Sequence, residues 1–167
     1  AASGVGFSPD LRQETCAPTF ADGVAWVDLD ALAAPSLLPQ AVAAALGLAE
    51  EPGAPILDVL VERLASARLL LVLDNCEHLA AACAQLVDTL LDAAPNLHVL
   101  AASRTPLGAA GECVWPLPLL PLPPADASLS QIAQCAAVRL FCARAATAAP
   151  AFTLNERNAA AVADICR

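Results

Sequence analysis

The sequence predicts an α/β fold built around a parallel sheet that is flanked by helices. Residues 69–73 form an uninterrupted aliphatic run and residues 97–101 (LHVLA) a second, mostly aliphatic run, and both are expected to be buried strands. Between them, residues 77–93 repeat apolar positions with the period of an amphipathic helix. A strand, a helix and a strand in this order predict a βαβ unit, whose two strands lie parallel in one sheet.

The segments before this unit predict one more strand and two more helices. Residues 24–29 (VAWVDL) follow an Asp-Gly turn and are rich in β-forming residues, as expected of a strand. Residues 37–47 are rich in alanine and end at Gly47, and glycine commonly ends a helix. Residues 56–66 place apolar side chains on one face and acidic ones on the opposite face, which predicts a second amphipathic helix.

The composition changes after Gly111. Residues 115–124 (WPLPLLPLPP) hold five of the 14 prolines, which predicts an extended connector. Residues 129–148 then have a helical pattern, and the sequence Thr-Leu-Asn-Glu at 153–156 has the form of a capping box that opens a further helix. We therefore predict an α/β core over residues 1–111, a connector over 112–127 and the beginning of a helical subdomain over 128–167.

Charge and composition exclude several classes of protein. The formal net charge is −9, and the eight basic residues are all arginines scattered singly, so we expect no direct nucleic-acid contact by this segment. No apolar run reaches about 18 residues and no signal-peptide pattern opens the chain, so we expect a cytoplasmic protein without membrane contact. The seven cysteines include no Cys-x-x-Cys pair and suit buried thiols. Cys76, His78 and Cys83 do not have the spacing of a common zinc site.

Polar residues follow the two aliphatic runs, at the sheet edge where parallel sheets bind their ligands. Asp74 could hold Mg²⁺ against substrate phosphates, or it could cap the helix that follows. Glu77 could orient an attacking water, or it could serve only to favour the first helical turn. Arg104 could contact a terminal phosphate, or it could pair with a surface carboxylate.

A glycine-rich turn lies near the start of the sequence. Gly4, Val5 and Gly6 have the form in which many phosphate-binding loops end, but Phe7 and Ser8 follow where lysine and a hydroxyl residue are expected. The sequence contains no lysine at all. The glycines could also serve only to permit a turn.

Several segments together resemble a known family. They are FADGVAWVDL, RLLLVLDNCEHL, LHVLAASRTPLG, WPLPLLPLP and AVRLFCARA…NAAAVADICR. They are similar to the STAND-class P-loop ATPases of the NB-ARC type, and more narrowly to the ATPase modules of large bacterial regulators that carry LuxR-type or SARP-type DNA-binding domains. The resemblance spans residues 20–167. It implies a P-loop NTPase (ASCE-type) parallel sheet flanked by helices, followed by the start of a helical subdomain.

The resemblance also implies a ligand and a role for two residues. The family binds ADP or ATP with Mg²⁺ and switches between a closed, ADP-held state and an open, signalling state. Asp74 takes the place of the Walker B carboxylate at the metal. Arg104 takes the place of the sensor arginine that reads the γ-phosphate. Arg104 and Glu77, the latter on its position after the strand alone, are the candidate catalytic residues.

The opening motif takes the place of the Walker A loop, in a degenerate form. Gly4, Val5, Gly6 and Ser8 would contact the phosphates, with Ser8 in the position of the hydroxyl that contacts the metal. Phe7 stands where the family has lysine, the strand ahead of the loop is missing, and the sequence stops short of the family's last segment. Losing the lysine removes a charge-assisted contact worth about 1.5–3 kcal/mol.

These features together predict an ADP/ATP-binding regulatory switch module of a larger bacterial transcriptional regulator, weak or inactive in hydrolysis. Its partners would be the nucleotide and the other domains of the full-length regulator, and it could oligomerise. The alternative is a non-enzymatic interaction scaffold that has lost nucleotide binding.

Overall fold

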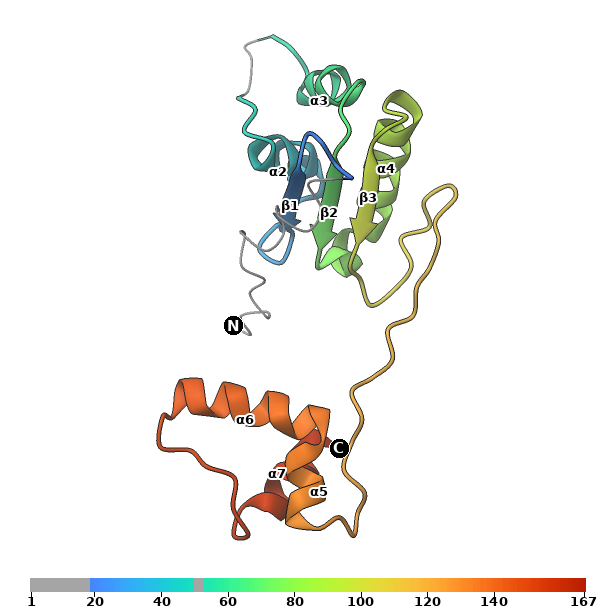
Figure 1. Ribbon diagram of the computed structural model, residues 1–167. Helices are drawn as coiled ribbons and strands as arrows, with labels where there is room; N and C mark the ends of the chain where they lie inside the picture. The colour runs from blue at the N-terminus through green and yellow to red at the C-terminus, as the bar shows by residue number, and fades with distance from the viewer. Residues whose placement is uncertain (1–18, 50–52) are drawn as a thin grey trace. The chain divides into compact units, whose positions relative to one another are not determined.

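The computed structural model describes residues 19–49 and 53–167, which form two compact units (Figure 1). The first unit ends at Val114, and the second comprises Trp115–Arg167. Each unit has a hydrophobic core of its own. The glycine-rich turn at residues 4–8 lies outside the described residues.

The first unit contains a parallel sheet of three strands in the order β1-β2-β3 (Figure 1). β1 comprises Val24–Asp28, β2 comprises Leu70–Asp74 and β3 comprises His98–Ala101. β2 pairs in parallel with both of its neighbours. The predicted α/β class with a parallel sheet is therefore confirmed.

In the described part of the first unit, three α-helices and two short 3₁₀ turns accompany the sheet. They are η1 (Pro35–Leu37), α2 (Leu38–Ala45), α3 (Ile56–Leu64), η2 (Cys76–Leu79) and α4 (Ala80–Ala93). α4 connects β2 to β3, as the amphipathic pattern between the two aliphatic runs predicts. Its apolar positions recur at helical spacing and become the buried side of the helix.

The core of the first unit lies between α2, α3, α4 and one face of the sheet. Alternate residues of a strand point to the same face, and the following strand residues belong to this core: Ala25, Val27, Leu71, Leu73, Val99 and Ala101. β2 is buried at its centre, as its unbroken aliphatic run predicts. β3 differs from the prediction of a buried strand, because Leu100 is 57% exposed. The reason is its place in the fold: β3 ends the strand order, and the helices cover the opposite face.

The loop after β3 is held by two carboxylates. Glu112 accepts hydrogen bonds from the backbone N–H groups of Leu107 (3.0 Å) and Gly108 (2.7 Å). Asp88 on α4 accepts one from the N–H of Ala110 (2.8 Å). These contacts satisfy backbone donors in a segment without regular structure, and they fasten the loop to α4.

The predicted helical stretch at 129–148 consists of two helices. α5 comprises Leu129–Gln134 and α6 comprises Ala136–Ala148, so the stretch is helical as predicted, apart from a break at Cys135. Cys135 breaks the helix with an extended backbone (φ −67°, ψ 132°). Its thiol donates a hydrogen bond to the carbonyl oxygen of Pro121 (2.7 Å). A tertiary contact therefore sets the break, and neither glycine nor proline marks it in the sequence.

The last helix, α7 (Ala159–Cys166), starts later than its predicted capping box. Thr153 and Glu156 do not open it. Asn158 occupies the position before the first helical residue, and its side-chain oxygen accepts a hydrogen bond from the N–H of Asn155 (2.8 Å). Short amide side chains stabilise tight turns by bonding to nearby backbone, and here they shape the entry to the helix.

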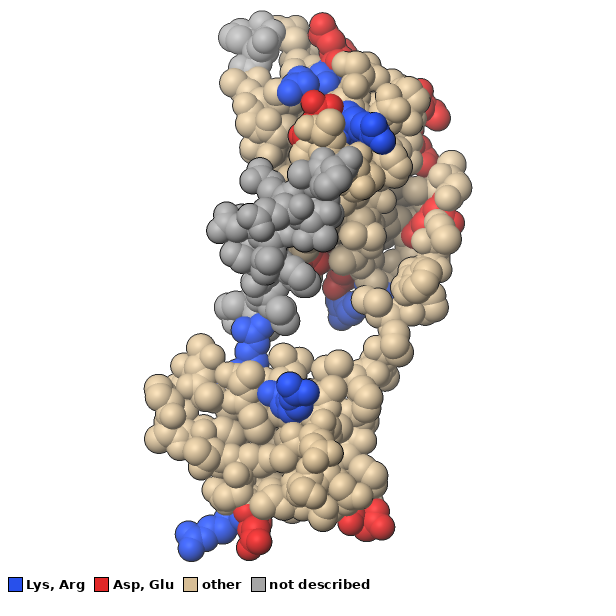
Figure 2. Space-filling view, in the orientation of Figure 1, with Lys and Arg blue, Asp and Glu red and all other residues tan. Residues whose placement is uncertain are grey.

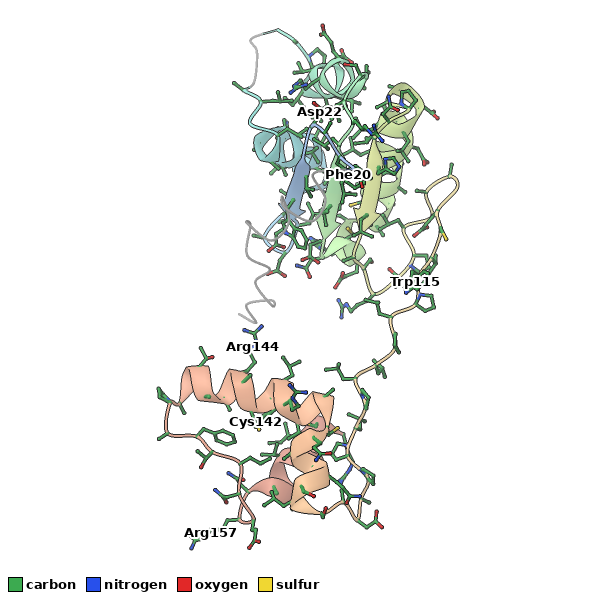
Figure 3. All side chains as sticks on the ribbon, in the orientation of Figure 1. Phe20, Asp22, Trp115, Cys142, Arg144 and Arg157 are labelled. Atoms are coloured by element: carbon green, nitrogen blue, oxygen red, sulfur yellow. The ribbon has the colours of Figure 1, made fainter. Side chains whose placement is uncertain are left out.

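The core of the second unit is small. Its buried members are Ile132, Val138, Ala159, Val162 and Ala163. Partly buried residues extend it, and Figure 3 shows Cys142 on the side of α6 that faces this cluster, whereas Arg144 points away from it.

The proline-rich segment forms neither helix nor strand over residues 112–124. Its large apolar side chains are exposed: Trp115 by 81%, Leu117 by 82% and Leu119 by 92% (Figure 3). Within the second unit, its far end contacts the last residue of the chain, because the guanidinium of Arg167 donates to the carbonyl oxygen of Pro123 (3.3 Å). Polyproline-type backbone leaves its carbonyl groups available for such contacts.

Acidic residues are concentrated in the first unit. Fourteen of the 17 acidic residues, but only four of the eight basic ones, precede Trp115. On the face seen in Figure 2, the described residues show basic and acidic side chains interspersed, without a basic stripe. Among residues 19–49 and 53–167, no helix is both long and apolar enough to cross a bilayer.

Candidate functional site

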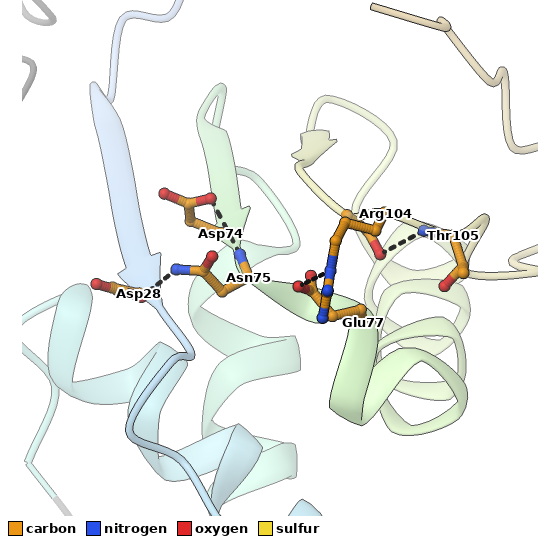
Figure 4. A network of polar contacts seen from close by, with 7 residues as sticks. Asp28, Asp74, Asn75, Glu77, Arg104 and Thr105 are labelled. Carbon is orange, nitrogen blue, oxygen red and sulfur yellow. Dashed lines mark hydrogen bonds and ion pairs between the residues drawn. The ribbon is translucent and has the colours of Figure 1, made fainter. Parts of the chain in front are cut away.

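The carboxyl ends of β1 and β2 place two carboxylates side by side (Figure 4). Asp28 is the last residue of β1, Asp74 is the last residue of β2, and the two are paired in the register of the sheet. Both lie on the face of the sheet opposite the helical core, because the preceding residues, Val27 and Leu73, face that core. The N–H of Leu29 donates to the carbonyl oxygen of Asp74 (3.0 Å), which continues the pairing beyond the strands.

The turn that leaves β2 is unusual. Asn75 has a left-handed backbone (φ 60°, ψ 47°), and among the described residues no other non-glycine residue has a positive φ. Its N–H donates to Oδ1 of Asp74 (3.0 Å), and its side-chain Nδ2 donates to Oδ1 of Asp28 (2.9 Å). Asparagine tolerates this conformation better than most residues. Asn75 therefore bonds to the last side chain of β1 and to the last side chain of β2.

The carboxylate of Asp28 is held in its charged form. The N–H of Asp30 donates to its Oδ1 (3.0 Å), beside the bond from Asn75. The bond from Asp30, then that from Asn75, lower the pKa of Asp28 below its ordinary value. Two donors on one carboxylate oxygen favour the ionised state and a fixed orientation.

The two other candidate site residues form an ion pair beside this turn. Nε of Arg104, which follows β3, lies 2.6 Å from Oε1 of Glu77 in η2 (Figure 4). Backbone hydrogen bonding at Glu77, then the bond from Arg104, lower the pKa of Glu77. The side chain of Arg104 is 84% exposed, that of Glu77 only 22%. Arg104 does pair with a carboxylate, as one interpretation of the sequence expects, and that carboxylate is the other candidate residue.

The polar groups at Asp74 suit a cation whose other ligands are mostly water and phosphate oxygens. Asp74 is half-buried, and its Oδ1 accepts the N–H of Asn75. Within residues 19–49 and 53–167, no group of three or more His, Cys, Asp or Glu side chains could hold a metal. Mg²⁺ in phosphate sites commonly takes one or two carboxylates, with water and phosphate as its other ligands. The side chains of the described residues therefore do not form a metal site built from protein alone.

The cysteine and histidine residues that follow Asp74 have structural contacts. Cys76 and Cys83 are fully buried, and the thiol of Cys76 donates to the carbonyl oxygen of Leu73 (3.5 Å). The hydrogen bond with Cys83, together with burial, raises the pKa of Cys76 far above its ordinary value, so this thiol stays protonated. Nε2 of His78 lies 3.0 Å from the carbonyl oxygen of Leu32. The two cysteines therefore support the turn after β2 from the core, and His78 contacts the loop after β1 at the surface.

The structure adds two residues that the sequence interpretation did not assign to the site, Asp28 and the side chain of Asn75. A signal for Asp28 exists in the sequence: VAWVD and LLVLD are both strands that end in aspartate. The conformation of Asn75 has no comparable signal. The predicted phosphate-contacting residues Gly4, Val5, Gly6 and Ser8 lie outside the described residues.

Comparison with known proteins places the chain beside bacterial regulators. It is 42% identical over 164 residues to "Putative HTH-type transcriptional regulator Rv0890c" of Mycobacterium tuberculosis, and equally to "Putative HTH-type transcriptional regulator Mb0914c" of Mycobacterium bovis. These alignments cover 98% of this chain and 17% of either relative.

A shorter relative aligns with part of the chain. "Uncharacterized protein Rv0894" of Mycobacterium tuberculosis is 42% identical over 123 residues, which are 74% of this chain and 28% of that protein. No family model matches the sequence, and no solved structure matches it.

Proposed function

We propose that this chain is the nucleotide-responsive switch module of a larger bacterial transcriptional regulator. It would be a STAND-class P-loop module that binds ADP or ATP with Mg²⁺ at the carboxyl edge of its sheet. The observation that carries the proposal is the convergence of Asp74, Glu77 and Arg104 after the ends of neighbouring parallel strands. The similarity to relatives named as transcriptional regulators supports the regulatory part. Since the chain spans 17% of those relatives, the output of the whole protein belongs to the proposal as well.

Asp74 and Arg104 would have different tasks in such a site. Mg²⁺, when bound, neutralises part of the phosphate charge, and Asp74 would hold it, directly or through water. Arg104 bonds to Glu77 through Nε alone. Its two terminal nitrogens can therefore donate to a phosphate. Arginine suits this task because its planar group can bond two phosphate oxygens at once.

This arrangement would let the module distinguish ATP from ADP. A ligand shifts a conformational equilibrium only through contacts that differ between two states. Arg104 would contact the γ-phosphate, which ADP lacks. Glu77 would keep the guanidinium oriented toward the site, since its carboxylate is charged and already bonded to Nε. The ion pair would then be part of the sensor.

Hydrolysis by this chain is expected to be weak or absent. The sequence has no lysine to supply the charge-assisted phosphate contact, worth about 1.5–3 kcal/mol. The lowered pKa of Glu77 also makes it a poor base toward water. Phosphoryl transfer depends almost entirely on positioned charge. The module would therefore bind and report nucleotide without turning it over efficiently.

The partners of this module would be other domains of the same regulator and, in an assembled state, further copies of it. The acidic residues of the first unit disfavour direct nucleic-acid contact by this segment. DNA binding would belong to another part of the full-length protein. The cytoplasm, where nucleotides and DNA are available, is the location that this role requires.

Thermal unfolding with and without nucleotide tests the proposal. At 100 times its Kd, a ligand adds about 2.7 kcal/mol of stability, or a rise in Tm of about 5–10 °C for a chain of this size. We expect such a rise with Mg-ADP and Mg-ATP, and a smaller one when a chelator removes Mg²⁺. Mg²⁺ alone and inorganic tripolyphosphate are the controls.

A folded chain without any nucleotide response would support a second function, that of an interaction scaffold. The exposed apolar side chains of the connector favour this candidate, because soluble proteins rarely expose contiguous apolar segments without a partner. The thermal experiment separates the two functions directly.

A further inference from the structure

The bond between Asp28 and Asn75 connects two strand ends at the candidate site. Oδ1 of Asp28 accepts Nδ2 of Asn75 at 2.9 Å, across 47 positions of the sequence (Figure 4). Asn75 in turn donates its backbone N–H to Oδ1 of Asp74 at 3.0 Å. A continuous path of hydrogen bonds therefore leads from the end of β1 to the carboxylate that would face Mg²⁺.

We propose that Asp28 is a positioning residue, which holds the side chain of Asn75 so that the left-handed turn keeps the Asp74 carboxylate oriented toward the metal. The inference rests on the proposed function, because it requires Mg²⁺ at Asp74. Asp28 acts here through Asn75 and does not itself contact the cation.

Two observations and one general finding support this role. The turn is sparsely populated, because a non-glycine residue holds a left-handed backbone there, and hydrogen bonds to Asp28 and Asp74 accompany it. Asp28 supplies one of these contacts, and its own orientation is fixed by the N–H of Asp30. Residues that orient a metal ligand without contacting the metal contribute strongly to metal affinity. Their removal commonly lowers that affinity about 10- to 100-fold.

A positioning role and a charge effect make different predictions for two variants of Asp28. Asp28→Ala removes both the hydrogen-bond acceptor and the negative charge. Asp28→Asn removes the charge but keeps an oxygen that can accept the bond from Asn75. If positioning is what matters, Asp28→Asn retains most of the parent's metal affinity and Asp28→Ala does not.

The experiment is a Mg²⁺ titration of the full chain at a fixed, saturating ADP concentration, with the rise in Tm as the readout. We expect Asp28→Ala to raise the half-saturating Mg²⁺ concentration about tenfold, and Asp28→Asn to restore most of that loss. Asp92→Asn is the matched control, since it removes an exposed aspartate in the last turn of α4 and should behave as the parent. The Tm of each variant without ligand reports whether the fold is intact.

A second variant tests the path through Asn75. Asn75→Gly permits the left-handed backbone but lacks the amide that bonds to Asp28. In that background, Asp28→Ala should cause no further rise in the half-saturating Mg²⁺ concentration. An additional tenfold rise there would mean that Asp28 acts by another route.

The outcomes separate the inference from the proposed function. If the parent chain shows no response to Mg²⁺ and ADP, the proposed function fails and the inference fails with it. If the parent responds but Asp28→Ala titrates like the parent, only the inference is overturned. If Asp28→Asn is as impaired as Asp28→Ala, the negative charge is what matters and the positioning role is wrong.

Discussion

Replacing Leu71 by alanine should destabilise the first unit by about 2–5 kcal/mol. Leu71 lies in the central strand and is 0% exposed, so the change removes buried side-chain atoms and leaves a cavity. Leu100 provides a matched control, because it lies on the neighbouring strand β3 and is 57% exposed. Full burial of a leucine side chain is worth about 1.5–3 kcal/mol, so Leu100→Ala should cost about 1 kcal/mol or less.

Urea unfolding followed by circular dichroism measures both variants. The midpoint should fall clearly for Leu71→Ala and slightly for Leu100→Ala, with the slope m unchanged, because neither change alters the surface exposed on unfolding. Equal losses for the two variants would refute the reasoning. That result would mean that the face of β3 bearing Leu100 is packed, and that the helical layer on the other face is not the main source of stability.

Three further predictions concern the candidate site and the loop beside it. Asp74→Ala should remove the Mg²⁺-dependent part of the nucleotide-induced rise in Tm; a rise equal to that of the parent would exclude Asp74 from the site. Arg104→Ala should weaken ATP binding more than ADP binding, measured by calorimetry, because its donors would meet the γ-phosphate; a parallel loss for both nucleotides would contradict that role. Hydrogen bonds from the N–H groups of Leu107 and Gly108 lower the pKa of Glu112 below its ordinary value. Its stabilising contribution is therefore present above the unfolded-state pKa and lost as pH falls through the lower folded-state value. The amide proton shifts of those two residues should titrate in that acidic range by NMR, and Glu112→Gln should abolish the titration.

Much of the first unit can be predicted from sequence, because local pattern and tertiary role agree there. The aliphatic run of β2 is buried at its centre, and the apolar stripe of α4 faces the core. The positions of Asp74 and Arg104 can be predicted from the strand pattern as well, because residues that follow parallel strands lie at one edge of the sheet. Their contact with nucleotide stays a prediction.

The remaining features depend on contacts between residues far apart in the sequence. The break at Cys135 is accompanied by a bond to Pro121, and no local helix signal distinguishes that residue from its neighbours. The left-handed turn at Asn75 and its bond to Asp28 join residues that become neighbours only when β1 and β2 pair. The exposure of Leu100 depends on strand order, which an aliphatic run cannot reveal.

The modest core of the second unit has a consequence for how the chain responds to stress. Units shorter than about 70 residues rarely gain more than about 3–5 kcal/mol from a single hydrophobic core, and this one buries five residues. Trp115–Arg167 should therefore exchange its amide protons by sub-global opening, at a lower free energy than the sheet of the first unit requires. The chain then contains a first unit whose sheet resists opening and a second unit that opens readily.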